Sequence, residues 1–330
     1  MELNQIFRSH MVLQANKPVN IFGRGEGTVK VETNGKTSET VAKGDWVVTL
    51  PPSDYSGPHS MKITMNEETV VLHDIYFGDV ILLAGQSNLQ FRMNASTYNE
   101  SLYKSNNLTR FYCSERPEEG EHFTPEDGWV VCDAETVGWW SAVGYHLADF
   151  LNEETNHAIG IVGCYQGGSS IQGWLPHESL ANTPAYIPFE NRCSKYPWNE
   201  DGFNYNFMFK KLIPFTFKAV VWYQGESNRR IDEAENYYFM LTTLIDLWRK
   251  DLKDLTLPFI VIQIHKYAAV LAGKGSEGWQ TVQAAQVKIA ETMENVYCVK
   301  SADVCEDNDI HPATKVHLGK RIAHKILELR

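Results

Sequence analysis

The chain has 330 residues, of which 43% are hydrophobic and 22% are charged. This composition is typical of a globular protein with about two domains, and it excludes a disordered chain or a disulfide-rich miniprotein. Acidic residues outnumber basic ones by 41 to 30, so the net charge is -11, which argues against binding to nucleic acid or to an anionic membrane. We expect a neutral partner, or a small anion bound by a local cluster.

No stretch approaches the roughly 18 apolar residues of a membrane span. The opening residues Met1–Gln5 lack the basic and apolar segments of an export signal, so we expect a cytoplasmic protein unless a leader has been removed. The six cysteines form no C-x-x-C pair, and several lie in apolar runs such as Ile161–Cys164. We therefore expect free buried thiols and no metal site.

Residues 1–76 carry the signals of strands and tight turns. Val29, Val31 and Thr33 alternate with polar residues and lead into the turn dipeptide Asn34-Gly35. Similar alternation recurs at Trp46–Leu50 and at Met61–Met65, with no helical period. This segment is predicted to form a small all-β sandwich domain.

Residues 77–330 change to short apolar runs separated by amphipathic stretches of helical length, which indicates a parallel sheet covered by helices on both faces. The expected strands are Val80–Ala84, Ala158–Cys164, Ala219–Tyr223, Phe259–Ile264 and Val296–Val299. The expected helices are Trp140–Asn152, Glu233–Lys250, Thr281–Thr292 and Ala313–Leu329. The long segment Gln172–Asn206, rich in proline and aromatic residues, is interpreted as a wall or lid over a cleft.

Ligands of such sheets bind beyond the carboxyl ends of the strands, so the residues that follow each apolar run are the candidates. Gly85–Asn88 (GQSN) follows the first run and would present the Ser87 hydroxyl at the start of a helix, as a nucleophile requires; alternatively, Ser87 is a helix cap. Gln166–Ser170 follows the second run, and its paired glycines would let backbone amides approach an oxyanion, although a plain turn explains them equally well.

Two further places lie later in the chain. Gln224 and Glu226 leave the third run, and Gln224 could donate a side-chain N–H to a developing negative charge; alternatively, both satisfy nearby loop amides. Asp309 and His311 precede the final helix and share one face of an extended segment, so the carboxylate could orient an imidazole that takes a proton from a serine. Without a partner serine, His311 would be an ordinary surface histidine.

Together these places resemble the SGNH hydrolases, and within them the sialate O-acetylesterases and their acetylxylan-esterase relatives. Gly85–Asn88, Gly167–Ser169, Gln224–Ser227 and Asp309–Pro312 look like the family's sequence blocks in order and spacing. His10–Pro18 and Gly44–Pro52 look like the β domain that precedes the hydrolase in sialate O-acetylesterases. The resemblance implies a three-layer αβα SGNH hydrolase with a flavodoxin-like sheet over residues 77–330, after an N-terminal β sandwich over residues 1–76.

The resemblance also implies a serine esterase with no cofactor. Ser87 would attack an acetyl carbonyl, and His311 would be general base and then acid, oriented by Asp309. The backbone N–H groups of Ser87 and Gly168 and the amide of Gln224 would hold the oxyanion, each contributing about 3 kcal/mol. The resemblance further suggests that four other side chains contact the substrate: Gln86, Asn88, Glu226 and Trp174.

The chain departs from the family pattern at two positions. The wider superfamily often places its aspartate three residues before the histidine, where this chain has Asn308, so Asp309 is assigned by analogy and Asp307 is the reserve. A dyad oriented by a backbone carbonyl is a further alternative. Leu89 replaces the usual methionine after Gln-Ser-Asn, a change that conserves volume.

Three hypotheses about the function remain open. Deacetylation of a sialic acid would require a cation near the sugar carboxylate, for which Arg92, Arg229 and Arg230 are nearest in sequence to the motifs. An acetylated xylan or another neutral glycan would depend more on aromatic platforms such as Trp174 and Trp198. A carbohydrate-binding protein without turnover would be expected to lack the nucleophile, the base or the glutamine.

Overall fold

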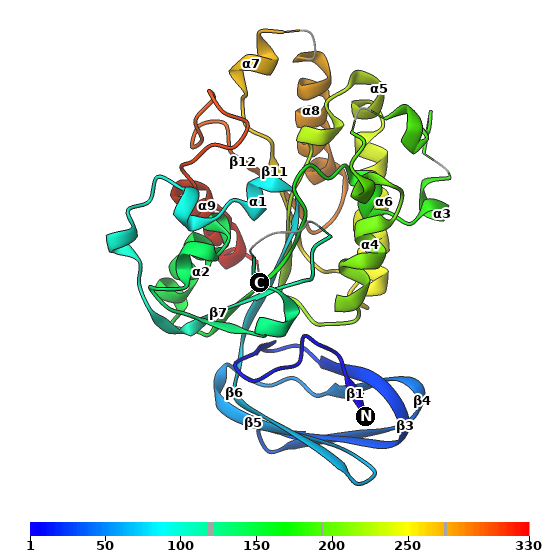
Figure 1. Cartoon of the computed structure of the whole chain (residues 1–330), viewed down its shortest axis with the longest axis vertical. Coiled ribbons are helices and arrows are strands. Elements are labelled where there is room, and N and C mark those ends of the chain that lie inside the picture. The colour runs from blue at the N-terminus through cyan, green and yellow to red at the C-terminus, as the bar shows by residue number, and fades with distance from the viewer. Residues whose placement is uncertain (118–121, 182, 193, 274–275, 330) are drawn as a thin grey trace.

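The computed structural model describes residues 1–117, 122–181, 183–192, 194–273 and 276–329 (Figure 1). The strands are β1 (Glu2–Leu3), β2 (Val12–Gln14), β3 (Val19–Thr33), β4 (Lys36–Leu50), β5 (Ser56–Met65), β6 (Glu68–Gly85), β7 (Asn106–Cys113), β8 (Val130–Cys132), β9 (Ile159–Tyr165), β10 (Ala219–Tyr223), β11 (Phe259–Gln263) and β12 (Val296–Lys300). The α-helices are α1 (Ser87–Gln90), α2 (Ala142–Thr155), α3 (His177–Leu180), α4 (Phe203–Phe207), α5 (Ile231–Ala234), α6 (Tyr237–Asp251), α7 (Ala268–Leu271), α8 (Ser276–Thr292) and α9 (Val316–Leu327). These elements form a mixed α/β fold around a large mixed sheet.

The strands β3 to β6 pair antiparallel at one end of the molecule (Figure 1). β3 and β4 form a hairpin around Asn34 and Gly35, both at positive φ, as the turn dipeptide predicts. Alternate residues of these strands face the core, among them Val29, Val31 and Ile63. The sequence therefore anticipated the hairpin, whereas a separate sandwich domain over residues 1–76 stays a prediction.

β6 is the strand that joins the two parts of the sheet. Its first half pairs with β5 and β2, and its second half, from Asp79 onward, pairs in parallel with β9 and β10. The expected boundary between residues 76 and 77 therefore lies inside a continuous strand.

The parallel strands run in the order β7, β9, β6, β10, β11, β12, with β8 antiparallel on β7. Chain order reverses around β6, because the strands that follow it lie first on one side and later on the other. In Figure 1, α2 and α9 lie on one side of these strands, and α6 and α8 lie on the other. The arrangement agrees with the helix-covered sheet expected from the sequence, and the finer SGNH assignment stays a prediction.

The sequence-based strand assignment missed β7. Arg110 lies in the middle of this strand with its side chain 2% exposed, 3.0 Å from the Asp74 carboxylate and 4.5 Å above the Tyr76 ring. A charged residue inside a buried strand conceals the apolar run that indicates strands elsewhere. The expected strand Val80–Ala84 is only the last part of β6, which begins at Glu68. The other expected strands and helices lie within a few residues of β9, β10, β11, β12, α2, α6, α8 and α9.

The cysteine expectation can be assessed for five of the six residues. Cys113, Cys132, Cys164, Cys298 and Cys305 are free thiols, and the first three are buried. Cys193 lies outside the described residues. Burial raises the pKa of the Cys113 thiol to about 11. In the part of the chain that the structure describes, no helix is both long and apolar enough to cross a membrane.

Candidate active site

The segments that follow three adjacent strands, β9, β6 and β10, meet at one edge of the sheet. Gly85 ends β6 at φ +141°, and a Cβ there would lie 2.2 Å from the Tyr223 carbonyl oxygen, so only glycine allows this approach of β6 to β10. The chain then turns into the short helix α1, with Ser87 as its first residue. The serine stands beyond the carboxyl end of the central strand, where the topology predicts a ligand.

Ser87 and His311 are in direct contact although 224 residues separate them. His311 Nε2 lies 2.8 Å from Ser87 Oγ. The imidazole also stacks on the Phe91 ring, with centroids 6.5 Å apart. With the proton on Nδ1, Nε2 accepts the serine hydroxyl proton, which is the geometry a general base requires.

The environment favours the neutral form of His311. Burial lowers the pKa of the imidazole, the Lys315 ammonium lowers it further, and the Asp309 carboxylate raises it. A neutral imidazole is the form that can accept a proton from Ser87. The electrostatics therefore suit a base at neutral pH.

The Asp309 carboxylate does not contact the imidazole as the motif suggested. Its Oδ1 accepts a hydrogen bond from the backbone N–H of His311 at 2.8 Å, and its carbonyl oxygen lies 2.8 Å from His265 Nε2. Among the described residues, no hydrogen bond links either Asp309 or the reserve residue Asp307 to the ring of His311. Asp309 thus shapes the loop and acts on the ring through its charge alone.

Two backbone N–H groups are available beside the serine. In the described residues, neither Ser87 N nor Gly168 N has a hydrogen-bond acceptor in the protein. Gly168 adopts φ +66°, which turns the loop after β9 toward α1, and the neighbouring Gly167 N–H donates to Gln90 Oε1 at 2.7 Å. These N–H groups are the predicted oxyanion donors, and their freedom is compatible with that role.

The Gln224 amide, the third predicted oxyanion donor, is already occupied. Its Nε2 donates to the Ser169 carbonyl at 3.0 Å and to Asn228 Oδ1 at 2.8 Å, while its Oε1 accepts from Tyr237. The side chain is fully buried. Both amide hydrogens are therefore used within the protein, and in this conformation Gln224 supports the Gly168–Ser169 loop rather than an oxyanion.

Asn88 and Glu226, predicted to contact substrate, instead form a buried charge network with Lys315. Asn88 Nδ2 donates to Glu226 Oε1 at 2.6 Å and to the Ile310 carbonyl at 3.1 Å, and Asn88 Oδ1 accepts from Lys315 Nζ at 2.7 Å. All three side chains are at most 1% exposed. Burial raises the pKa of Glu226 and lowers that of Lys315 to about 8. This network fastens the His311 loop to α1.

Gln86 and Trp174 are also too buried to touch a substrate. Gln86 is 3% exposed, and its side-chain amide lies against the backbone N–H groups of Gly225 and Ser227. Trp174 is fully buried, donates to Ser169 Oγ at 3.0 Å and packs edge-on against Trp222 and Trp248. The large apolar surface that made Trp174 a candidate platform serves the core instead.

The three candidate arginines are engaged within the protein. Arg92 lies 4.5 Å above the Trp139 ring, and Arg229 donates to the Glu226 carbonyl at 3.2 Å. Arg230 pairs with Asp232 at 2.5 Å and with Glu233 at 3.5 Å.

Sequence reasoning missed several residues around the serine: Gln90, Tyr196, Asn199 and Lys315. Asn199 donates to the Gly168 carbonyl at 3.0 Å and accepts from the Ser170 N–H at 2.6 Å, which ties the long aromatic segment to the glycine loop. Nothing in the local pattern around Lys315 distinguishes it from a surface lysine, because its burial depends on α1 and on the loop after β10. The aromatic content of the segment was the available signal for Tyr196.

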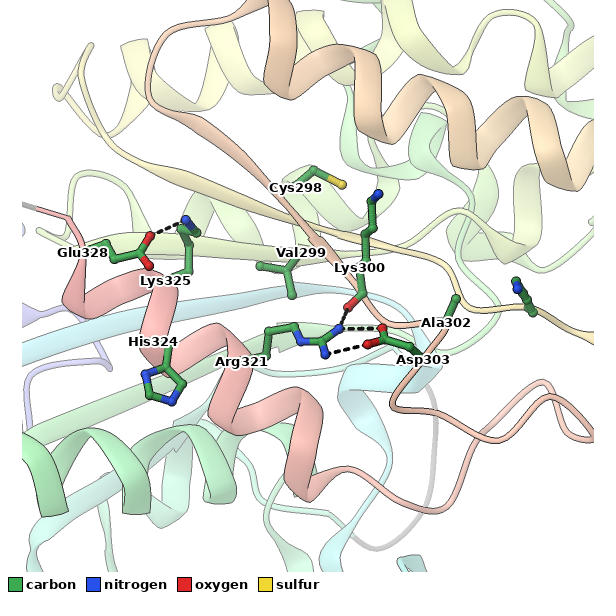
Figure 2. Close-up of a pocket in the computed structure, with 10 residues that line it drawn as sticks. Cys298, Val299, Lys300, Ala302, Asp303, Arg321, His324, Lys325 and Glu328 are labelled. Carbon is green, nitrogen blue, oxygen red and sulfur yellow. Dashed lines mark hydrogen bonds and ion pairs between the residues drawn. The ribbon is translucent and has the colours of Figure 1, made fainter.

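A surface cavity of about 660 Å³ between β12 and α9 lies apart from these residues (Figure 2). It is rich in charge, but Arg321 forms a two-point ion pair with Asp303, and Lys325 pairs with Glu328. None of its lining residues belongs to the motifs singled out in the sequence, so the candidate site remains at Ser87.

Comparison with known proteins identifies the family. Residues 77–328 match the model of the carbohydrate esterase, sialic acid-specific acetylesterase family. Sialate O-acetylesterase from Mus musculus is 27% identical over 95% of this chain and 71% of its own length, and the Homo sapiens protein is 27% identical over 91% and 66%.

Solved structures with a similar fold include a carbohydrate acetylesterase. The crystal structure of a carbohydrate acetylesterase from Xanthomonas citri superimposes with a TM-score of 0.84 at 26% identity, covering 99% of this chain and 74% of that one. An Arabidopsis thaliana protein structure shares the fold with a TM-score of 0.53 at 21% identity, over 77% of this chain and 100% of that one. The chain belongs to the carbohydrate esterase, sialic acid-specific acetylesterase family and is a carboxylic ester hydrolase.

Proposed function

We propose that this protein removes O-acetyl groups from sugars through an acyl-enzyme formed on Ser87, with sialic acid as the first candidate substrate. The observation that carries the proposal is the 2.8 Å contact between Ser87 Oγ and His311 Nε2. The sialate O-acetylesterases among its relatives suggest the sialic acid. Neither the formation nor the hydrolysis of this acyl-enzyme requires a cofactor.

In the first step, Ser87 Oγ attacks the acetyl carbonyl carbon while its proton passes to His311 Nε2. The carbonyl oxygen gains the negative charge, and the N–H groups of Ser87 and Gly168 stabilise it. His311 then returns the proton to the sugar oxygen as the C–O bond breaks, and the sugar leaves. Water then attacks the acetyl-serine carbonyl while His311 takes its proton, and His311 returns that proton to Ser87 Oγ as the bond to the acetyl group breaks and acetate leaves.

The proposed mechanism uses Asp309 differently from a fully hydrogen-bonded triad. Its carboxylate holds the His311 backbone and stabilises an imidazolium ion through charge, consistent with its upward influence on the pKa of His311. Charged Asp309 thus complements the proton that His311 carries between the two steps.

A neutral acetylated glycan is the second candidate substrate. Each of the three arginines nearest the motifs already has a partner in the protein: an indole ring, a backbone carbonyl or carboxylates. A sialic acid carboxylate would compete with those partners, whereas a neutral sugar needs no cation.

Acetate release tests the proposal directly. We expect the wild-type protein to deacetylate 9-O-acetylated sialic acid, acetylated xylan or both, and Ser87→Ala to lose at least about a thousandfold in kcat, because no covalent intermediate forms. Exposed Ser101 provides the matched control, and Ser101→Ala should retain full activity. A fluorophosphonate adduct on a serine other than Ser87 would refute the assignment.

A further inference from the structure

An exposed tyrosine ring stacks on a tryptophan ring in the segment before α4. The Tyr196 and Trp198 rings have centroids 4.7 Å apart and planes only 6° apart, and we call this pair the aromatic stack. Tyr196 is 53% exposed, whereas Trp198 is half-buried. Trp198 thus supports a ring that keeps much of its surface open to solvent.

The aromatic stack lies beside the candidate oxyanion donor. A Cβ placed on Gly168 would come within 2.9 Å of Tyr196 Cε2, so the edge of the tyrosine ring rests against this glycine. A Cβ on the adjacent Gly167 would lie 3.8 Å from Ser87 Cβ. Only two glycines therefore separate the tyrosine ring from the nucleophile, close enough for one sugar ring to touch both.

Hydrogen bonds hold the aromatic stack in place. Asn199 follows Trp198 directly and bridges the Gly168 carbonyl and the Ser170 N–H. The buried Arg192 guanidinium donates to the Asn199 carbonyl at 2.8 Å and pairs with Asp201 at 2.5 Å. A surface fixed in this way binds a ligand without first losing conformational freedom.

We propose that the Tyr196–Trp198 aromatic stack is the subsite that holds the sugar ring whose acetyl group reaches Ser87. A pyranose has a face of C–H bonds and a rim of hydroxyl groups, so its C–H face can cover the exposed aromatic ring while the rim stays hydrated. Lys195, the neighbouring cation, is turned back onto the Phe189 carbonyl at 3.1 Å. The subsite is thus aromatic and uncharged, and it rests on the proposed esterase function.

The test compares one substrate that carries a sugar with one that does not. Acetylated methyl xyloside and methyl acetate are hydrolysed by wild-type protein, Tyr196→Ala and Tyr196→Phe, with acetate measured in each case. We expect Tyr196→Ala to raise KM for the xyloside at least tenfold, and to lower the xyloside-to-methyl-acetate ratio of kcat/KM by the same factor. Tyr196→Phe keeps the ring and should restore the ratio to within threefold of wild type.

Two further measurements separate the possible failures. Phe239→Ala removes an equally exposed ring (50%) from α6 and should leave both substrates unaffected. In a Ser87→Ala background, calorimetry should detect xyloside binding that Tyr196→Ala abolishes. Equal losses on both substrates, or an unchanged ratio, would overturn the subsite. Full activity of Ser87→Ala would instead refute the esterase mechanism, independently of Tyr196.

Discussion

At the scale of single residues, the proposed mechanism divides the polar groups of the site into two kinds: those that would act on a substrate and those that hold the first kind in place. Ser87, His311 and the Gly168 N–H are of the first kind. Gln224, Asn88 and Lys315 are of the second, because their hydrogen bonds end on other protein atoms. The two kinds cannot be distinguished from the motifs alone, since both lie in the same short sequence blocks.

Lys315, a member of the buried charge network, lowers the pKa of His311. Its ammonium is one cause of the lowered pKa of His311, so Lys315→Met should raise that pKa. Because the proposed mechanism requires the deprotonated imidazole, the rise of kcat/KM with pH should move to higher pH by about half a unit or more. A pH–rate profile measures this shift. Lys315→Arg should remain close to wild type, and so should Lys320→Met on α9; an unmoved profile for Lys315→Met would contradict the role.

Substitution of Gln224 or of Asn228 should lower kcat to a similar extent. Gln224 donates to Asn228, which in turn accepts from the Ile171 N–H at 2.9 Å and donates to Gln172. If Gln224 acts through this network, Asn228→Ala should lower kcat to within about tenfold of Gln224→Ala, since either change releases the Gly168 loop. Steady-state kinetics with folding checked by circular dichroism decides the matter. A loss confined to Gln224→Ala would point to a direct oxyanion contact.

At the scale of elements, the aromatic segment between β9 and α4 is held by one carboxylate. Asp201 accepts from His177 Nδ1 at 2.8 Å, from Arg192 at 2.5 Å and from the Tyr186 hydroxyl. Burial tends to raise the pKa of Asp201, but these donors outweigh it and hold the pKa below the usual value. These side-chain bonds, together with the short helix α3, hold the described residues of this segment despite its four prolines.

Asp201→Asn should loosen this segment. The buried Arg192 would lose its carboxylate, which we expect to lower the free energy of unfolding by about 3 kcal/mol at pH 7. Since the pKa of Asp201 is depressed in the folded state, the difference from wild type should persist at neutral pH and shrink only as pH falls through that lowered pKa. Urea unfolding at several pH values measures it. Asp232→Asn, in an exposed ion pair, is the control expected to change little; equal effects would contradict the argument.

Elements were easier to anticipate from sequence than roles. Apolar runs such as Ala219–Tyr223 correspond to strands because a parallel strand is buried on both faces. The order of the motifs predicted that Ser87 and His311 would meet. Trp174 was misjudged because burial depends on Trp222 and Trp248, which are distant in sequence, and the pairing of Asp309 with a backbone N–H depends on loop geometry that spacing does not encode.

At the scale of the whole molecule, Asp79 on β6 links the two parts of the sheet. Its carboxylate accepts from Lys218 at 3.0 Å, from the Tyr55 hydroxyl at 3.0 Å and from Gln14 at 3.4 Å. Gln14 ends β2 and Tyr55 immediately precedes β5, whereas Lys218 immediately precedes β10. One buried carboxylate therefore joins the N-terminal strands to the segment that leads into β10.

Asp79→Ala should weaken this connection strongly. The change leaves Lys218 without its counter-ion in a largely buried place, so we expect a loss of about 3–5 kcal/mol in the free energy of unfolding. Calorimetry should show a lower melting temperature and a broadened or divided transition, since the two parts would unfold less cooperatively. Asp45→Ala, at a fully solvated site on β4, is the control. An unchanged single transition in Asp79→Ala would refute the link.

The continuity of β6 also bears on how this protein can be shortened. A fragment beginning at residue 77 would cut β6, the strand that leads into Ser87, and would remove Val12, whose side chain packs against Gly160 of β9. The strand that precedes Ser87 would then begin as a frayed end beside uncovered apolar surface. A minimal catalytic version of this esterase should therefore retain the N-terminal strands, even if they never touch the ester.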